Sequence, residues 1–563
     1  MTTRRSLLLI LAAAALLWAP TLLVAAPGDS FSYTLNWSRQ FTAAFLGGDP
    51  YPRWTAASFD GLGAPTFYFY PPLPFWATAL IGAATGGLLS AGLQAKLAVL
   101  AFLALSGFAM FAWLRTRAGA LASLAGALVF MAAPYHLDDH YVRGAFAEFA
   151  AYALLPMLGL GLAACARGGR WGVPGLAAGW AALIACHLPT ALLAGVLLVA
   201  PYGLFLIREA SGGRIAAASR IGLAICAGTA IAALYLVPSL LLQSAVSSEY
   251  WWSDRFQAAQ RVFANPAAWS LPLEPFLAAL SFGEAALAGV IAWRLRRSGD
   301  RQALVWGVLV VAVFLVIAGL VPGFWSLPLM AKVQFPWRAM SLEEFALATL
   351  FAWCGPRART PMVVIALAAL VCGNAIAVAR VLAAGPMAAR AGYGERTFPT
   401  DADAPEYLPA GMLRMTADGP ALAVPLGALT SRPLAAGPVL RAEADAAHGR
   451  VRLVVDPGRA GPIVLRRFYF PAWSVRCDGA LVASSALPGA RLVSFTPPPG
   501  ARACEARIEP TPPERLGFLV SLAGLTLVAA YALLTSRVGR RMRLGAGPRA
   551  PIATDPAAAA RTG

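Results

Sequence analysis

Long apolar runs recur along this chain, and they constrain its fold more than any other feature of the sequence. Many of them hold about 18 or more residues, which is enough for one helix to cross a hydrocarbon layer about 30 Å thick. Of the 563 residues, 59% are hydrophobic and only 13% are charged. Soluble proteins carry about a quarter charged residues. The sequence therefore predicts an α-helical protein that crosses a membrane many times.

The formal net charge of +18 could suggest nucleic-acid binding. However, the arginines gather at the ends of apolar runs, as they do in the cytoplasmic loops of membrane proteins. We therefore expect no nucleic-acid partner and explain the charge by membrane topology. The clusters are Arg115 and Arg117; Arg167 and Arg170; Arg208, Arg214 and Arg220; Arg294, Arg296, Arg297 and Arg301; Arg357 and Arg359; and Arg537, Arg540, Arg541 and Arg543.

Alternation of these clusters with the apolar runs predicts twelve spans and cytoplasmic termini. The first run, Ser6–Ala26, is longer than the apolar region of a signal peptide, so we expect it to remain as a span. We expect Pro72–Leu89 to be an interfacial or re-entrant helix, because a crossing there would put Arg115 and Arg117 outside. The other predicted spans are Leu93–Leu114, Leu121–Pro134, Phe146–Ala166, Gly172–Cys186, Thr190–Ile207, Ile215–Pro238, Leu271–Trp293, Ala303–Leu320, Leu342–Cys354, Met362–Ala379 and Leu516–Ser536.

Composition divides the chain into a membrane module, a polar domain, a last span and a tail. The polar domain alternates strand-like stretches such as RVRLVV with Gly and Pro turns, which predicts an external β-sandwich. The low-complexity tail is expected to be disordered and cytoplasmic. The parts are the membrane module 1–380, with external loops 27–72, 135–148, 243–269 and 321–341; the periplasmic β-rich domain 381–513; the last span 514–536; and the tail 537–563.

The chain has seven cysteines. Five of them lie in or beside apolar runs, where we expect small buried hydrophobic residues. Cys477 and Cys504 lie in the polar domain and could pair if that domain faces an oxidising compartment. The sequence leaves both states of this pair open.

The first external loop begins with an acidic residue. Asp29 lies just past the first apolar run, at the membrane surface. A carboxylate there could act as a general base toward an acceptor hydroxyl while a lipid-linked donor stays in the bilayer. The alternative is a solvated residue at a helix end, or a cap for a short following helix. The sequence alone does not decide between them.

The second external loop reads YHLDDHYVRGAFAE and holds several charged side chains in an otherwise charge-poor chain. Asp138, Asp139 and His140 could bind a divalent cation, and Glu148 lies close by. Arg143 could bind a phosphate group with two hydrogen bonds. The alternative is an ordinary solvated loop. We therefore predict an acceptor or metal region formed by these residues.

A third cluster, KVQFPWR, spans Lys332 to Arg338 in a later external loop. A lysine and an arginine that bracket aromatic residues suit the phosphate or diphosphate head group of a prenyl lipid. The alternative is that both side chains extend toward the interface without a ligand. His187, in CHLPT, is expected to be a histidine at the end of a span. No Walker A motif, CxxC pair or GxSxG elbow is present, so nucleotide-driven transport and serine hydrolysis lack support.

Taken together, these motifs resemble a known group of membrane proteins. The stretches YPRW…GLGAPTFYFYPPL and PYHLDDHYVRGAFAEF resemble the bacterial family labelled 6-pyruvoyl-tetrahydropterin synthase-related, and QFPWR and FYFPAWSVRCDG resemble the YfhO-like membrane proteins. Both groups are similar to the GT-C glycosyltransferases, which use polyprenyl-phosphate sugars at the external face of a membrane. The pterin label does not extend to function, because the soluble synthase needs a three-histidine zinc site and this chain has only four scattered histidines.

The resemblance implies roles for particular residues. In GT-C enzymes the base is an Asp in the first external loop, which corresponds here to Asp29. Acidic residues of the second external loop, here Asp138 and Asp139, contribute to the acceptor or metal site. The fold implied is GT-C-like, with an interfacial helix that closes the first loop. The location implied is the inner (plasma) membrane of a bacterium.

The function we predict is an inverting transfer of a sugar from a polyprenyl phosphate to an envelope glycan, lipid or protein. Arg143, Lys332 or Arg338 would bind the phosphate, no cofactor is certain, and a divalent metal is an open option. Two alternatives remain: a polysaccharide or lipid transporter or flippase, and a non-catalytic factor in envelope assembly. The aromatic residues expected to stack on sugar faces are Tyr51, Trp54, Tyr68 and Tyr70.

Overall fold

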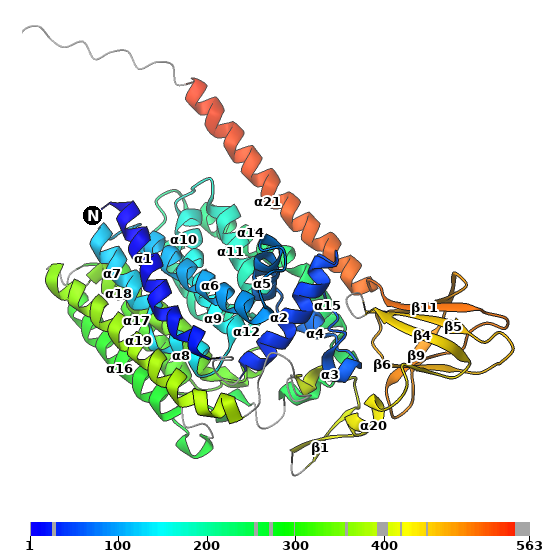
Figure 1. The fold of residues 1–563 in the computed structure, drawn as a ribbon. Coiled ribbons are helices and arrows are strands. Elements are labelled where there is room, and N and C mark those ends of the chain that lie inside the picture. The colour runs from blue at the N-terminus through cyan, green and yellow to red at the C-terminus, as the bar shows by residue number, and fades with distance from the viewer. Residues whose placement is uncertain are drawn as a thin grey trace, which may run out of the picture.

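The computed structural model has two parts, a large helical module and a smaller β-domain, which Figure 1 shows at the lower right. The long helix α21 (Pro512–Gly545) follows the β-domain and runs back along the module. A mostly helical protein with a C-terminal β-sheet domain was predicted, and this fold class is confirmed. The structure describes residues 2–24, 30–252, 257–269, 274–297, 299–354, 359–390, 403–416, 419–445 and 449–545.

Within these described ranges, nine helical segments are long and apolar enough to cross a membrane. Three further predicted spans are helices of 15 to 17 residues, namely α11 (Gly172–Cys186), α17 (Arg301–Ile317) and α18 (Met340–Cys354). The count of twelve spans therefore stays a prediction. The nine segments are Thr3–Leu23, Ala91–Leu114, Ala120–Tyr141, Phe146–Ala166, Leu188–Arg208, Arg214–Ile231, Glu274–Leu295, Thr360–Ala383 and Pro512–Thr535.

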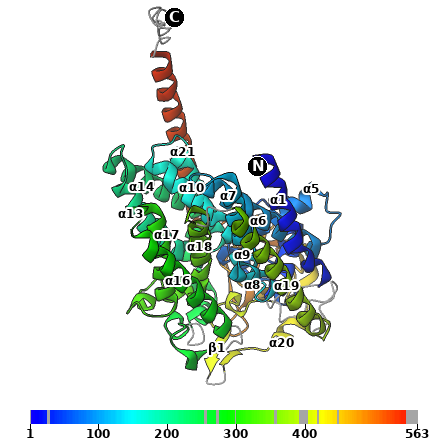
Figure 2. The same ribbon diagram turned by 90° about the vertical axis from the view of Figure 1, so that its left-hand side faces the viewer.

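Several of these segments consist of two helices in sequence. Figure 2 shows the side of the module on which α16, α17, α18 and α19 lie. The helices of the module not yet given are α1 (Thr3–Trp18), α2 (Phe31–Leu46), α3 (Ser58–Gly61), α4 (Thr66–Phe69), α5 (Leu73–Ala84), α6 (Ala91–Leu114), α7 (Ala120–Met131), α8 (Pro134–Tyr141), α9 (Phe146–Ala151), α10 (Leu155–Ala166), α12 (Leu188–Ala194), α13 (Ala200–Arg208), α14 (Arg214–Ile231), α15 (Ala233–Leu241), α16 (Glu274–Leu295) and α19 (Arg359–Arg390).

Polar residues mark where the helices begin. The side chain of Ser90 accepts a hydrogen bond from the backbone N–H of Leu93 at the start of α6. Thr511 and Glu514 form a capping box at the start of α21, in which the Thr511 N–H donates to Glu514 Oε2 at 2.7 Å. Such side chains satisfy the free N–H groups of the first helical turn. The helix α5 has only 12 residues, which fits the prediction of an interfacial helix at Pro72–Leu89.

Small residues let α21 lie close against the module. A Cβ atom on Gly517 would come within 2.5 Å of the Ala233 carbonyl oxygen, so the two backbones touch there. One turn later, Ser521 donates to the Ile231 carbonyl at 2.8 Å. Membrane helices that lack large side chains at their contact approach in this way.

The helix α21 is also longer than the sequence predicted. It has 34 residues, about 51 Å of helix, and continues to Gly545. Residues 537–545 of the predicted tail belong to this helix, residues 546–563 lie outside the described residues, and the disordered cytoplasmic tail stays a prediction.

The β-domain contains two larger antiparallel sheets and one hairpin. Strand β5 alternates buried and exposed residues, so that Val451, Leu453 and Val455 point into the core. The sheet orders are β4-β5-β11-β7-β8 and β3-β6-β10-β9, with the hairpin β1-β2 and the short helix α20 (Leu426–Thr430) beside them. The strands are β1 (Leu413–Thr416), β2 (Gly419–Leu422), β3 (Ala435–Ala436), β4 (Val439–Asp445), β5 (Arg450–Val455), β6 (Ile463–Phe468), β7 (Trp473–Cys477), β8 (Ala480–Val482), β9 (Ser484–Ala486), β10 (Leu492–Phe495) and β11 (Ala503–Ile508).

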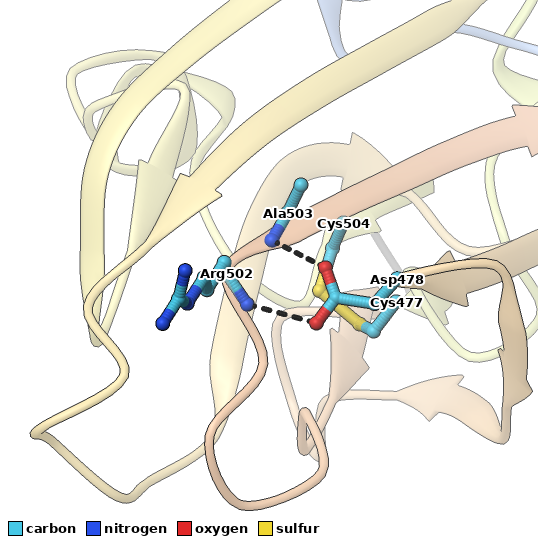
Figure 3. Close-up of a disulfide and its surroundings, with 5 residues drawn as sticks. All are labelled: Cys477, Asp478, Arg502, Ala503 and Cys504. Carbon is cyan, nitrogen blue, oxygen red and sulfur yellow. Dashed lines mark hydrogen bonds between the residues drawn. A yellow bond between two sulfur atoms is a disulfide. The ribbon is translucent and has the colours of Figure 1, made fainter.

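A disulfide joins two neighbouring strands of the larger sheet (Figure 3). Cys477 on β7 and Cys504 on β11 are direct register partners, and their sulfur atoms are bonded. Next to them, Asp478 accepts hydrogen bonds from the backbone N–H groups of Arg502 and Ala503, both at 3.0 Å. The cross-link closes a loop of 27 residues, which stabilises the fold by roughly 3–4 kcal/mol in the chain-entropy treatment.

The end of the first loop packs against the β-domain, and we call this contact region of the loop the seat of the β-domain. The backbone N–H of Phe468 donates to the Leu62 carbonyl at 2.7 Å, and Arg467 donates to the Gly61 carbonyl. The ring of Trp54 packs against Trp473, with 5.6 Å between the ring centroids. This part of the loop is therefore a folded interface between the two parts of the protein.

A buried ion pair fastens the same loop to α21. Arg53 Nε lies 3.0 Å from Glu514 Oε1, and both side chains are nearly inaccessible. The guanidinium also stacks on the ring of Tyr51 at 3.7 Å and donates to the Leu234 carbonyl at 2.8 Å. The first loop thus holds both the β-domain and the helix that follows it.

We predict that Gly63→Ala weakens this seat more than Gly61→Ala does. Both glycines have φ near +80°, so both alanines carry about 1–2 kcal/mol of backbone strain. A Cβ on Gly63 would also lie 2.4 Å from the Trp54 ring, whereas the nearest atom at Gly61 is 3.9 Å away. The extra clash costs about 1–3 kcal/mol. Melting temperatures in detergent compare the two variants, and equal losses would contradict the role of Trp54.

Candidate functional site

The carboxylate of Glu148 lies at the centre of a buried group of charged side chains. We call Tyr135, Asp139, Arg143, Glu148 and Arg338 the Glu148 cluster. Its members come from α8, the turn after it, the first turn of α9 and the loop before α18. Four of the predicted site residues, Asp139, Arg143, Glu148 and Arg338, are in direct contact here, although the last is far from the others in sequence.

Each oxygen of Glu148 has a defined partner. Oε2 accepts from Arg143 Nη2 at 3.0 Å and from Arg338 Nε at 3.2 Å. Oε1 accepts from the Tyr135 hydroxyl at 2.6 Å. Arg143 also pairs with Asp139 and donates to the Tyr135 oxygen at 2.7 Å. Two carboxylates therefore balance two guanidinium groups, which lowers the cost of burying all four.

Tight backbone turns hold the two arginines in place. After α8, the N–H of Arg143 donates to the Asp138 carbonyl at 3.0 Å, and Gly144 follows with φ +62°. In the other loop, Arg338 Nη1 donates to the Val333 carbonyl at 2.7 Å. Its guanidinium also lies 5.0 Å from the centre of the Phe335 ring. Both guanidinium groups are fixed before any ligand arrives.

The two arginines are the most accessible members of the cluster. The side chains of Arg143 and Arg338 keep 17% and 12% of their surface exposed. The carboxylates of Glu148 and Asp139 keep 1% and 0%. A ligand that reaches the cluster therefore meets guanidinium groups, while the carboxylates stay behind them. This arrangement favours an anion.

His187 approaches the cluster from a break between two helices. The helix α11 ends at Cys186 and α12 begins at Leu188, so His187 has extended backbone angles. Its Nδ1 atom lies 2.7 Å from the Thr190 hydroxyl, and its Nε2 atom lies 4.0 Å from Glu148 Oε2. Burial lowers the pKa of His187 to about 3, against the opposite effect of Glu148, so the imidazole is neutral at pH 7. The sequence offered only the Pro that follows His187 by two residues as a signal of the break.

The predicted acceptor or metal region does not converge on one point. Asp139 and Glu148 belong to the cluster, but Asp138 lines a cavity of about 160 Å³ together with Phe276 and Arg380. His140 is hydrogen-bonded to Thr21, at 2.8 Å from its hydroxyl. The side chains of one helix point in several directions, which a linear motif cannot show. Among the described residues, no three His, Cys, Asp or Glu side chains gather as metal ligands do.

Two charged candidates remain, Lys332 and Asp29. Lys332 is exposed in the loop that leads to Arg338. Asp29, the predicted base, lies outside the described residues. The residue after it, Ser30, donates its backbone N–H to the Arg143 carbonyl at 2.9 Å. The described chain that follows Asp29 is therefore tied to the turn that carries Arg143.

The four aromatic residues predicted to stack on sugars lie in different surroundings. The structure places Trp54 in the seat of the β-domain, and Tyr51 under the Arg53 guanidinium. Tyr68 is buried and donates to Glu514 at 3.2 Å. Trp54 and Tyr68 are buried within the protein, whereas Tyr51 is half-buried, so the role of these rings in stacking on sugars stays a prediction. Tyr70 is half-buried, and its hydroxyl feels the charges of Arg338 and Glu148, although burial is the main cause of its raised pKa.

The structure also contains a second group of buried carboxylates, which the sequence motifs did not predict. Glu343 and Glu344, near the start of the predicted span Leu342–Cys354, are buried, and Glu284 on α16 lies near them. Glu344 accepts from the Tyr135 N–H and the Tyr152 hydroxyl, both at 2.7 Å. Glu343 accepts from Ser281 at 2.6 Å. A single acidic residue inside a long apolar run gives no sign of which other helix it faces.

We predict that Glu148→Gln destabilises the module by about 3–5 kcal/mol, because it removes one charge from a buried set of paired charges. The melting temperature in detergent measures the loss. Glu209→Gln is the control, since Glu209 pairs with Arg301 at the surface, and it should change stability by less than about 0.5 kcal/mol. Similar melting temperatures for the two variants would show that the cluster does not stabilise the fold.

We predict that His187→Gln makes stability less dependent on pH between about 6.5 and 4. In this range the unfolded chain protonates the imidazole, whereas the folded protein, with its lower pKa, does not. Stability of the native protein therefore falls as the pH drops, by up to about 1.4 kcal/mol per unit from this group. The groups that face His187 are Glu148, Arg143 and Arg338. Parallel melting curves for variant and wild type across this range would contradict the prediction.

Comparison with known proteins gives a family and two partial structural likenesses. The arabinofuranosyltransferase AftD from Mycobacteria aligns with a TM-score of 0.45 and 16% identity, over 68% of this chain and 27% of that chain. ArnT from Cupriavidus metallidurans, solved with undecaprenyl phosphate, aligns with a TM-score of 0.42 and 17% identity, over 71% of this chain and 68% of that chain. Both TM-scores are below 0.5, so we base no functional conclusion on them.

No curated protein sequence matches the chain. In contrast, a family model described as the 6-pyruvoyl-tetrahydropterin synthase related domain of membrane proteins matches residues 67–381, more than half of the chain. The predicted family is thereby confirmed, and the match includes α8, α9 and the loop that carries Arg338. The protein belongs to this family of 6-pyruvoyl-tetrahydropterin synthase-related membrane proteins.

Proposed function

We propose that the protein is a membrane glycosyltransferase that moves a sugar from a polyprenyl phosphate to an envelope glycan, lipid or protein acceptor on the external side. The observation that carries the proposal is the accessible edge of the Glu148 cluster. Two arginines, each held by several hydrogen bonds, are partly exposed there, while their carboxylate partners are buried. A phosphate that links a sugar to a lipid is an anion of the size that such a pair binds.

The cluster lies where a lipid head group would be expected. It contains the turn between the segments Ala120–Tyr141 and Phe146–Ala166, both long enough to cross a membrane. Its other arginine lies just before α18. Head groups occupy the ends of membrane spans, and lipid chains lie beside the helices. A lipid could therefore place its phosphate at Arg143 and Arg338 without leaving the bilayer.

The proposed reaction needs a base and a stabilised leaving group. Asp29 takes the proton from the acceptor hydroxyl, whose oxygen attacks the anomeric carbon of the donor sugar. The bond from that carbon to the phosphate oxygen breaks, and its electron pair leaves with the phosphate. Arg143 and Arg338 stabilise the charge that develops there, because they are already oriented before the reaction. The attack from the opposite side inverts the anomeric centre.

Tyr70 and Lys332 complete the proposed donor site. Tyr70 is the one predicted sugar-stacking residue whose hydroxyl is close enough to Arg338 and Glu148 to feel their charges. Its ring contacts Trp37 with 4.8 Å between centroids, and the residue is half-buried, so its accessible part would meet the sugar. Lys332 would attract the anionic head group from the surface.

The β-domain would bind the acceptor. Its larger sheet carries a groove of about 560 Å³ in which Arg452, Glu505 and Arg476 are cross-strand neighbours. Alternating donors and acceptors suit the hydroxyl groups of a glycan. The disulfide also supports an external position, since such bonds persist in oxidising compartments. We therefore propose that the domain is periplasmic, in the inner membrane of a bacterium.

The alternative of a transporter or flippase is favoured by a different observation. Glu284 and Glu343 are buried within the helical module, and each has one carboxylate oxygen without a hydrogen-bond partner. Ionisable groups inside spans are typical of ion or proton pathways. Under this alternative, Glu284→Gln and Glu343→Gln would abolish function. For a glycosyltransferase, these two changes leave transfer intact. A non-catalytic assembly factor has no specific observation in its favour.

We predict that Arg143→Ala and Arg338→Ala each lower kcat/KM for transfer at least about 100-fold, because each removes a group that stabilises the leaving phosphate. Asp29→Asn should abolish transfer and leave the melting temperature unchanged. The measurement uses protein reconstituted with candidate undecaprenyl-phosphate sugars, and mass spectrometry follows the product. Arg301→Ala is the control, because this exposed arginine forms only a surface ion pair. Full activity of Asp29→Asn would disprove the mechanism.

A further inference from the structure

His187 provides a donor that the proposed reaction does not yet use. Its side chain leaves the break between α11 and α12 and keeps 10% of its surface exposed, on the same order as Arg143 and Arg338. Its Nε2 atom is 4.0 Å from Glu148 Oε2, which is beyond hydrogen-bond distance. The atom is thus directed at the cluster without being bonded to it.

The contacts of the imidazole with Glu148 and Thr190 favour one of its two neutral forms. If Nδ1 carried the proton, the lone pair of Nε2 would face the negative oxygen of Glu148, which is unfavourable. If Nε2 carries it, the N–H faces that oxygen, and the Thr190 hydroxyl donates to Nδ1 across 2.7 Å. Thr190 is completely buried, so its hydroxyl cannot bond to bulk water instead. The partner of one ring nitrogen commonly sets the proton position on the other.

We propose that His187 binds the anionic phosphate of the lipid substrate through Nε2–H, with Thr190 and Glu148 holding the ring in that form. This inference rests on the proposed function, because it names a further residue of the same phosphate site. The role is that of a neutral donor. It adds a third hydrogen bond beside Arg143 and Arg338 without adding a positive charge to a cluster whose four charges already balance.

Side chains that imitate one ring nitrogen at a time test the assignment. The amide nitrogen of glutamine reaches the position of Nε2, whereas that of asparagine reaches only the position of Nδ1. His187→Gln should therefore bind undecaprenyl phosphate within about threefold of wild type. His187→Asn and His187→Phe should bind it at least about tenfold more weakly, the usual effect of losing one hydrogen bond to a charged group.

Thr190 provides an independent pair of variants. Thr190→Val removes the donor to Nδ1 and keeps the shape of the side chain, so binding should weaken several-fold. Thr190→Ser keeps the hydroxyl and should bind like wild type. Affinities are measured by tryptophan fluorescence on the full-length protein in nanodiscs, and melting temperatures verify folding. If His187→Phe does not fold, the Gln and Asn pair and the Thr190 pair still decide the question.

Control measurements test the role of His187 separately from the proposed function on which it rests. Inorganic phosphate, tested alone and as a competitor, shows whether the site takes a free anion or requires the lipid. If Arg143→Ala and Arg338→Ala lose binding but His187→Phe does not, the inference is wrong and the phosphate site stands. If the arginine variants also bind like wild type, the proposed function itself is wrong. Equal losses in His187→Gln and His187→Asn would contradict the assignment to Nε2.

Discussion

One carboxylate shared by two guanidinium groups holds the proposed site together. Glu148 joins the turn after α8, the start of α9 and the loop before α18, although nearly two hundred residues separate Glu148 from Arg338. Without this carboxylate, two positive charges would lie next to each other among buried side chains, at a cost of several kcal/mol. With it, both arginines remain in fixed positions and still present an edge to a ligand. The geometry on which the proposed chemistry depends is therefore also a condition for the folding of the module.

The sequence predicts the overall organisation well, because it follows from composition. Apolar runs and arginine clusters predicted the helical membrane module, and RVRLVV was predicted as a strand, which is β5; the structure adds that Val451 and Leu453 are its buried residues. The sequence also identified Arg143, Glu148 and Arg338 as site residues. That they meet could not be deduced, because charge and spacing describe one segment at a time. The position of His187 depends on the way two other helices pack, so the sequence indicated only a break.

The aromatic residues of the first loop show why residue type alone misleads. Rings at Trp54 and Tyr68 suggest a sugar platform, but their neighbours, Trp473 and Glu514, lie some four hundred residues later in the chain. A tertiary contact at such a distance leaves no local pattern. The same aromatic composition would suit a glycan or a domain interface, since both need large, partly polar rings. The structure assigns these rings to the interface and leaves Tyr70 near the charged cluster.

The ion pair between Arg53 and Glu514 also has a consequence for how the chain is made. Synthesis proceeds from the N-terminus, so Arg53 and its aromatic neighbours emerge long before their partner exists. The membrane helices can insert and pack in the meantime, but the loop waits with an unpaired arginine until the β-domain has folded and α21 has entered the bilayer. A chain that stops before Pro512 would keep the contact of Trp54 with the β-domain but would leave Arg53 and Tyr68 without their carboxylate partner, Glu514. Completion of the last helix thus serves as the final step of assembly for the first loop.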